Sequence, residues 1–291
     1  DGLGALKRIM AETPCPVVMV SSLTDHGATA TMQALELGAV DFVLKPSGDI
    51  SLDVYKVESE LVSKVKIAAA IPQWRLRGSQ DARLRVFTPA EERIFPARKA
   101  QPTRLAILAA STGGPGALHR LLATLPTDFA MSLLIVQHMP EGFTAALADH
   151  LNARAAVTVR EATAGDRLEN GLALVAPGGW HMELTANRRV SLVRSPSRHG
   201  VRPAVDVTLE SIPQAWARRC VVIVLSGMGV DGRAGAQYLQ EHGASVWAQD
   251  EASCVVFGMP RAVFELGIVE RAGTPEQLGH WLCDYASGGN K

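Results

Sequence analysis

The sequence shows no long hydrophobic segment, no secretory-signal pattern and no cysteine cluster. No apolar run approaches the roughly 20 residues that a helix needs to cross a bilayer. The first residues, from Asp1 onward, carry neither the basic region nor the apolar region of a secretory signal. We therefore expect a cytoplasmic protein without membrane insertion. The four cysteines lie far apart without a Cys-x-x-Cys pair, which argues against a disulfide framework or a zinc site. We expect no metal and no cofactor.

The chain also lacks a net charge. Lys and Arg together number 29 and Asp and Glu together number 29, so the formal charge is zero. A neutral chain has no global field that gathers phosphate backbones or anionic lipid, and we expect no nucleic-acid partner. The composition, with 47% hydrophobic and 20% charged residues, is that of a globular protein. A chain of 291 residues has room for about two domains.

Hydrophobic pattern and composition divide the sequence into three regions. Residues 1–67 alternate helical and strand patterns, residues 68–102 are rich in proline and arginine, and residues 103–291 alternate strands and helices again. We interpret 68–102 as a solvated linker between two domains. The alternation of strands and helices in 103–291 predicts an α/β fold, with a mostly parallel, doubly wound sheet and an antiparallel hairpin at its edge. The same alternation predicts a smaller βα domain at residues 1–67.

Short apolar runs and amphipathic stretches locate the expected elements. The expected strands are 16–20, 41–44, 105–108, 133–136, 172–175 and 221–225, with the hairpin at 180–184 and 190–193. The expected helices are 29–37, 52–67, 117–123, 143–151, 205–216 and 234–241, and Leu6, Ile9 and Met10 fall at helical spacing. Gly38 is placed to end the helix 29–37.

Three reactive side chains follow three of the expected strands. Ser111 comes after 105–108, His138 after 133–136 and Asp231 after 221–225. In an open parallel sheet, ligands bind beyond the carboxyl ends of the strands. A hydroxyl, an imidazole and a carboxylate are the groups that nucleophilic acyl transfer needs, because the serine attacks, the histidine takes its proton and the aspartate orients the imidazole. We therefore predict a serine hydrolase site at this edge.

Taken singly, each of the three residues has a commoner structural explanation. A Ser-Thr-Gly-Gly turn is typical of a helix cap or a phosphate cradle, a lone histidine is usually a structural residue, and an aspartate before glycine is typical of a turn or a cap. Two other functions therefore stay open. One is a phosphate-binding or nucleotide-binding module, although the glycine spacing matches neither GxGxxG nor GxxxxGK[ST]. The other is a non-catalytic signalling module.

Residues 103–291 resemble the catalytic domain of the bacterial chemotaxis protein-glutamate methylesterase/glutamine deamidase family. The matching stretches run through the region in order: ASTGG at 110–114, QHMP at 137–140, APG at 176–178 with HM at 181–182, RP at 202–203 with VD at 205–206, GMG at 227–229 with DG at 231–232, and EASCVVFGMP at 251–260.

The resemblance implies a catalytic triad of Ser111, His138 and Asp231, with Thr112 and Met228 beside the reacting carbonyl. It implies hydrolysis of glutamate γ-methyl esters, and deamidation of glutamines, on the cytoplasmic helices of methyl-accepting chemoreceptors. One departure is Ala109, where the family usually has glycine. Because alanine is the smallest replacement, we expect activity to survive.

Residues 1–67 resemble the second half of a response-regulator receiver. Ser21 matches the family's switch hydroxyl and Lys45 its phosphate-contacting lysine. The phosphoacceptor aspartate would precede Asp1, so we expect the chain as given not to respond to a phosphodonor. The resemblance also suggests a chemotaxis histidine kinase as a partner of this region.

Overall fold

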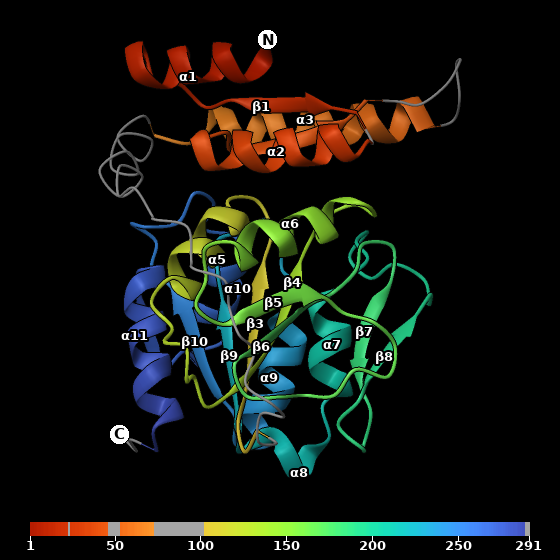
Figure 1. The fold of residues 1–291 in the computed structure, drawn as a ribbon, viewed down its shortest axis with the longest axis vertical. Coiled ribbons are helices and arrows are strands. Elements are labelled where there is room, and N and C mark those ends of the chain that lie inside the picture. Colours follow the sequence, from red (N-terminus) through yellow and green to blue (C-terminus); the bar gives the residue numbers. More distant parts are fainter. Residues whose placement is uncertain (23, 46–52, 73–101, 289–291) are drawn as a thin grey trace. The chain divides into compact units, whose positions relative to one another are not determined.

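The structure, a computed structural model, describes residues 1–22, 24–45, 53–72 and 102–288. It divides the chain into two compact units, Asp1–Phe87 and Thr88–Lys291 (Figure 1). Most of the expected linker 68–102 lies outside the described residues. The expected boundaries between domain 1–67, linker 68–102 and domain 103–291 therefore stay predictions.

The first unit packs helices around two parallel strands. β1 pairs with β2 in a register that sets Val18 opposite Asp41, and α2 and α3 both contact β1 or β2. Thr24 starts α2 by accepting a hydrogen bond from the Gly27 N–H at 2.9 Å, and Gly38 ends it with φ +114°. The elements are α1 (Gly2–Glu12), β1 (Val18–Ser21), α2 (Asp25–Leu37), β2 (Asp41–Leu44) and α3 (Asp53–Ala69).

The second unit is built on a parallel sheet of seven strands in the order β11-β10-β9-β3-β4-β6-β5. The chain enters at the central strand β3, builds one side of the sheet and then returns to build the other. Every residue of β3, β4, β6 and β9 is buried, as expected for strands covered on both faces. The strands are β3 (Leu105–Ala110), β4 (Ser132–Gln137), β5 (Thr158–Glu161), β6 (Leu172–Val175), β9 (Cys220–Val224), β10 (Ser245–Gln249) and β11 (Arg271–Gly273).

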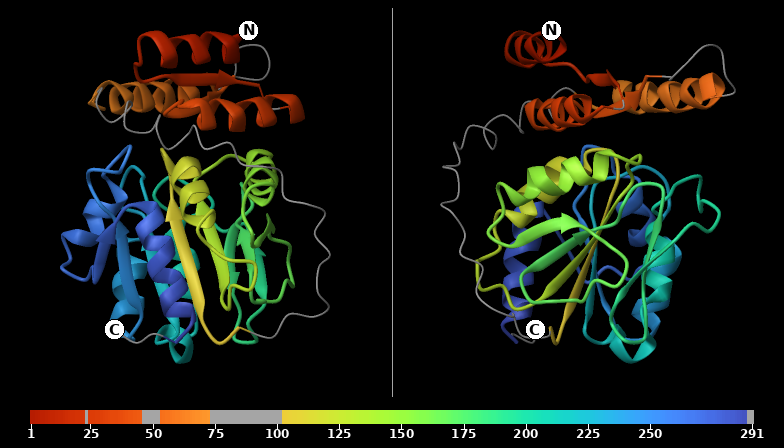
Figure 2. Two further views of the ribbon diagram at one scale, coloured as in Figure 1. Left: turned by 60° about the vertical axis from the view of Figure 1, so that its left-hand side comes forward. Right: turned by 45° about the vertical axis from the view of Figure 1, so that its right-hand side comes forward.

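Two groups of helices cover the sheet (Figure 2). In one group α5 contacts α6 and α11, and in the other α9 contacts α7, α8 and α10. The helices are α5 (Gly114–Leu122), α6 (Phe143–Asn152), α7 (Val205–Ser211), α8 (Gln214–Ala217), α9 (Arg233–Glu241), α10 (Met259–Phe264) and α11 (Pro275–Ala286). A separate antiparallel hairpin, β7 (His181–Leu184) with β8 (Val190–Val193), completes the unit.

The α/β fold with a mostly parallel sheet is confirmed, with two differences of detail. The hairpin forms its own two-stranded sheet rather than pairing with an edge of the large one. The expected helix 205–216 is two helices, α7 and α8, because Pro213 has no N–H to continue the first helix and stands as the N-cap of the second. The edge strands β5 and β11, the strand β10 and the helices α10 and α11 were not among the expected elements.

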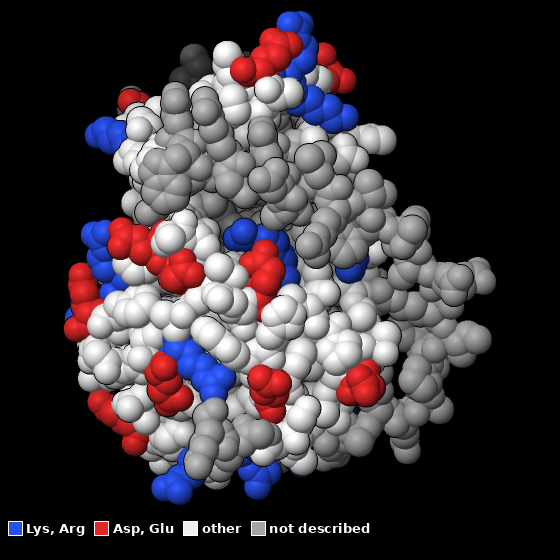
Figure 3. Space-filling model, turned by 90° about the vertical axis from the view of Figure 1, so that its left-hand side faces the viewer, with Lys and Arg blue, Asp and Glu red and all other residues white. Residues whose placement is uncertain are grey.

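The described residues include no helix long and apolar enough to cross a membrane. On the face shown in Figure 3, acidic and basic side chains are interspersed, and neither sign forms a continuous patch over the described part of the surface.

Two glycines provide a matched test of how tightly α11 packs against α5. A Cβ on Gly279 of α11 would lie 2.1 Å from Thr124 Oγ1 and 2.8 Å from Leu121 O, whereas a Cβ on Gly116 of α5 would meet nothing within 4 Å. We expect Gly279→Ala to lower the free energy of unfolding by about 1–3 kcal/mol through overpacking. Gly116→Ala should raise it by about 0.5–1 kcal/mol.

Urea unfolding of both variants checks this expectation. Equal effects of the two alanines would contradict the close approach of α11 to α5.

Candidate active site

The turn after β3 places Ser111, which is half-buried, at the edge of the sheet. The Ser111 N–H donates to Ser226 O at 3.1 Å, which ties the turn to the end of β9, and the Gly114 N–H donates back to Ser111 O at 2.8 Å. Gly113 has φ +77°, and a Cβ there would lie 2.5 Å from the Val255 side chain. The turn therefore needs glycine at this position both for its backbone conformation and for its packing.

His138 stands beside Ser111 because of the register of two strands. β3 and β4 pair in parallel with Ala110 opposite Gln137, and the His138 N–H continues the ladder by donating to Ala110 O at 3.0 Å. Ser111 and His138 are thus the next residues along neighbouring strands, which run about 4.8 Å apart.

Asp231 comes from the loop after β9, the other neighbour of β3. Its Oδ2 lies 2.7 Å from Nε2 of His138 and also accepts the Val205 N–H at 2.6 Å, and its Oδ1 accepts the Asp206 N–H at 3.0 Å. Only 2% of the Asp231 surface is exposed. The structure therefore brings all three predicted residues to one edge and joins two of them by a hydrogen bond.

The hydrogen bond to Asp231 determines which imidazole nitrogen can act as a base. An ionised carboxylate only accepts hydrogen bonds, so Nε2 of His138 carries the proton and Nδ1 keeps the free electron pair. No hydrogen bond joins Ser111 Oγ to the imidazole among the described residues. Such contacts are often open in a free enzyme and close when substrate binds.

The surroundings of Asp231 favour its ionised form. Burial acts to raise its pKa, but the hydrogen bond and charge of His138 and the N–H groups of Asp206 and Val205 outweigh burial and lower the pKa of Asp231 below its usual 3.8. The carboxylate therefore keeps its negative charge at neutral pH and can stabilise a cationic His138.

A buried amide links the serine turn to the histidine turn. Nε2 of Gln137 donates to Ser111 O at 2.9 Å and to His138 O at 3.1 Å, and Gln137 is 2% exposed. Two further buried polar residues brace the same edge: Ser226 Oγ donates to Thr112 O at 2.8 Å, and the Ser226 N–H donates to Gln249 Oε1 at 2.8 Å.

Sequence reasoning assigned no role to Gln137, Ser226 or Gln249. Gln137 and Ser226 directly follow predicted strands, and that position is the signal that could have identified them. Gln249 ends β10, a strand that the sequence did not predict, so it had no such signal.

Thr112 and Met228, the residues expected beside the reacting carbonyl, lie at this edge. Thr112 follows the serine and is 6% exposed, whereas Met228 is 46% exposed. Met228 follows Gly227, where an added Cβ would lie 2.9 Å from Ser111 Cβ. Their expected roles toward a substrate stay predictions.

Two further histidines have defined partners. His181 is fully buried, accepts the Ala204 N–H at Nδ1 and contacts Pro196 O at 3.1 Å through Nε2, so it packs within the core. His199 lies 2.8 Å from Asp206 Oδ2, next to Asp231.

His199, Asp206 and Asp231 form the one described group of three side chains whose ligand atoms lie close enough together, within 4.8 Å, to hold a metal ion. Their carboxylate oxygens already have partners: Asp231 binds His138 and two backbone N–H groups, and Asp206 binds His199 and the N–H groups of Gly232 and Gly235. These residues therefore fit a hydrogen-bonded cluster better than a metal centre.

Cys220 is not a candidate nucleophile. Cys220 opens β9 in the core, and burial raises the pKa of its thiol to about 12. A thiol with that pKa is protonated at neutral pH and is not a nucleophile.

The residues resembling a receiver switch lie in the first unit. Ser21 Oγ donates to Gly27 O at 3.2 Å and accepts from Thr31 Oγ1 at 2.7 Å, and the Lys45 N–H donates to Ser21 O at 2.7 Å. Ser21 and Lys45 are therefore neighbours through the backbone, and the Lys45 side chain is exposed. Their switch roles stay predictions.

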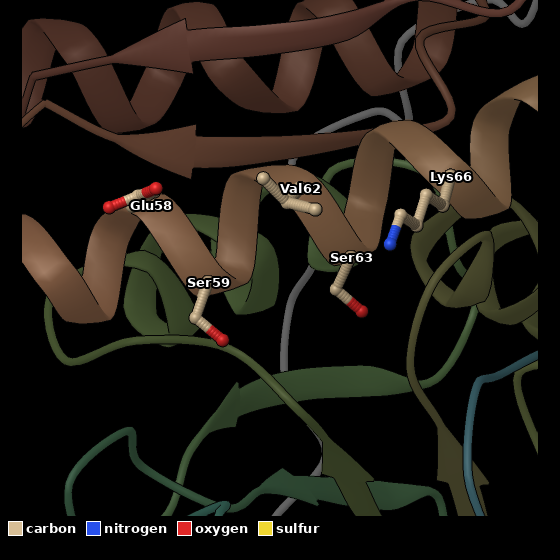
Figure 4. Close-up of a pocket in the computed structure, with 5 residues that line it drawn as sticks. All are labelled: Glu58, Ser59, Val62, Ser63 and Lys66. Atoms are coloured by element: carbon tan, nitrogen blue, oxygen red, sulfur yellow. The ribbon is translucent and has the colours of Figure 1, made fainter.

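A hollow on the first unit is lined by one helix, α3, as Figure 4 shows. Its lining residues are Glu58, Ser59, Val62, Ser63 and Lys66. Because all five come from one face of a single helix, they do not converge on a ligand, and the hollow is a weaker candidate than the edge with Ser111.

Comparisons with known proteins agree on the family. The CheB methylesterase family profile matches residues 106–282. The chain belongs to the CheB methylesterase family.

Curated relatives of the CheB family extend the match to most of the chain. A protein named protein-glutamate methylesterase/protein-glutamine glutaminase from Symbiobacterium thermophilum is 49% identical over 284 residues, covering 92% of this chain and 75% of that protein. A protein of the same name from Pyrococcus horikoshii is 41% identical over 277 residues, covering 93% and 73%.

A solved CheB structure matches the second unit. The crystal structure of the Thermotoga maritima CheB methylesterase catalytic domain is 36% identical, with a TM-score of 0.61, and the match covers 62% of this chain and 98% of that chain.

Acid should destabilise the protein partly through Asp231. Because the folded state lowers the pKa of Asp231, its charge stabilises the fold above the unfolded-state value near 3.8, and that contribution is lost as the pH falls through the folded pKa. We expect the free energy of unfolding to fall less steeply below pH about 4 in Asp231→Asn than in the native protein. Urea unfolding across pH 3–7 measures both slopes, and equal slopes would show that Asp231 is not stabilised as a carboxylate.

The buried amide of Gln137 should matter for stability. Gln137→Leu removes the amide donor from His138 O and one of two donors from Ser111 O, which keeps the Gly114 N–H, and we expect a loss of about 1–3 kcal/mol in the free energy of unfolding. The matched control is Gln237→Leu, because Gln237 is exposed and donates only to Glu241 within α9. A loss no larger than that of the control would argue against the bridge.

Proposed function

We propose that the protein is a serine hydrolase that demethylates glutamate γ-methyl esters on chemoreceptor cytoplasmic helices. The observation that carries the proposal is the 2.7 Å contact of His138 with Asp231 beside Ser111, at one edge of the sheet. The names of the curated relatives supply the substrate class and add deamidation of glutamines. Such a reaction adjusts receptor signalling in bacterial chemotaxis or a related pathway.

The chemistry follows from the three side chains. Nδ1 of His138 removes the proton of Ser111 Oγ as this oxygen attacks the ester carbonyl, and the ionised Asp231 stabilises the imidazolium. The tetrahedral intermediate collapses when the imidazolium returns the proton to the departing methoxide, which leaves as methanol. Water then attacks the acyl-serine, again losing a proton to His138, and releases the glutamate carboxylate. A glutamine substrate follows the same steps with ammonia as the leaving group.

The developing oxyanion needs donors beside Ser111. We propose that these donors lie in the segments around Thr112 and Met228, which follow β3 and β9 at the same edge. We further propose that the first unit is the second half of a receiver domain and that it contacts a chemotaxis histidine kinase in the cytoplasm.

Removal of the nucleophile tests the function. We expect Ser111→Ala to lower the rate of methanol release from a methylated receptor fragment at least about 10³-fold, because the variant lacks the oxygen that forms the acyl intermediate. The control is Ser191→Ala, a serine in the hairpin strand β8.

Methanol release is measured with the whole chain and a receptor fragment labelled on its methyl groups. A Ser111→Ala variant that retains most of the activity, or a native protein without activity, would contradict the proposed function.

A further inference from the structure

A second histidine–carboxylate pair lies directly behind Asp231. Nε2 of His199 is 2.8 Å from Asp206 Oδ2 and 3.9 Å from Asp231 Oδ1. Asp206 has no exposed surface, whereas the His199 side chain is 36% exposed. The backbone of His199 has φ +54°, a left-handed conformation that is uncommon outside glycine and often marks a functional constraint.

The two carboxylates hold each other's backbone in place. Asp231 accepts the N–H groups of Val205 and Asp206, at the start of α7. In return, Oδ1 of Asp206 accepts the N–H groups of Gly232 at 3.0 Å and Gly235 at 2.8 Å, at the start of α9. Because Gly232 follows Asp231 directly, Asp206 fixes the backbone that carries Asp231.

The charges around this pair are few and identifiable. Asp206 faces His199 from α7 and Asp231 faces it from the loop before α9. On its own segment, Arg198 lies 3.7 Å from Asp206 Oδ2 and pairs with Glu210 through both terminal nitrogens. His138 approaches Asp231 at its other oxygen. The two buried carboxylates therefore face two histidine rings, backbone N–H groups and an arginine that also pairs with Glu210.

Resting on the proposed hydrolase function, we propose that Asp206 and His199 are positioning residues for the reaction. Asp206 anchors Asp231 and adds a second negative charge behind the His138–Asp231 pair, which favours the imidazolium form of His138. His199 holds the Asp206 carboxylate in place and offsets part of that charge. The two residues thus act on the basicity of His138 in opposite directions, through Asp231.

Two conservative substitutions separate charge from shape. Asp206→Asn keeps an acceptor for Gly232 and Gly235 but removes a negative charge. We expect kcat for methanol release to fall at least about tenfold with KM within about twofold, and the acid limb of the pH profile to move to lower pH by about 0.3 unit or more.

His199→Gln keeps an N–H donor for Asp206 but cannot carry a positive charge. We expect a several-fold loss of kcat and a shift of the acid limb to higher pH. The matched control is His242→Gln at the far end of α9, where Nδ1 contacts Tyr238 O at 2.7 Å. This control should leave the acid limb in place.

The sign of the shifts decides the inference, because a purely structural defect lowers the active fraction without moving the acid limb. Opposite shifts in Asp206→Asn and His199→Gln support the positioning role. Unmoved limbs, or shifts in the same direction, overturn it while the native activity and the loss in Ser111→Ala leave the proposed function intact.

A measurement without turnover covers variants too slow to assay and the case of an inactive native protein. Nuclear magnetic resonance titration of the His138 ring, in the Ser111→Ala background of the whole chain, should show the same two opposite shifts. Coincident titration curves in the two variants would overturn the inference whatever the activity, and lost chemical-shift dispersion would show misfolding.

Discussion

The hydrogen-bond register of β3 with its two neighbours is the constraint on which the site depends. β4 and β9 flank β3 in the sheet, and the parallel ladders end at the same level, so the residues that follow the three strands emerge side by side. Since β3 is also the strand from which the chain builds first one side of the sheet and then the other, its end is a switch point, where open α/β sheets bind their ligands. A slip of one residue would turn Ser111 away from His138.

A second constraint is electrostatic. The site keeps an ionised carboxylate almost fully out of water, which is unfavourable unless donors replace the lost hydration. Asp231 obtains these donors from His138 and from the start of α7, and Asp206 obtains its own from His199 and the start of α9. Positively polarised helix starts suit this task because their first N–H groups have no partner within the helix. Fold and site are therefore stabilised by the same contacts.

Much of this arrangement is encoded locally. The fully apolar runs of β3, β4 and β9 predicted buried parallel strands, and the reactive residues could be placed at their ends because strand ends are visible in the sequence. β11 has three residues and β10 starts and ends with polar side chains, so neither gave a strand pattern. The order of the strands in the sheet could not be predicted, because no local sequence pattern shows which strands pair.

The bonds of Asp206 have no local signal either. They connect residues 26 and 29 positions apart, and a sequence pattern does not show such a contact. For the same reason no pattern in the sequence pointed to His199, and Gln137 was visible only as part of a motif.

Covalent labelling of the native protein with a fluorophosphonate ester tests the central claim most directly, because this reagent reacts with a serine only when a neighbouring base activates it. Mass spectrometry of the digested protein should find a single adduct on Ser111, and replacement of His138 by Gln should slow its formation by orders of magnitude. An unlabelled Ser111, an adduct on another serine, or labelling that does not depend on His138 would contradict the account.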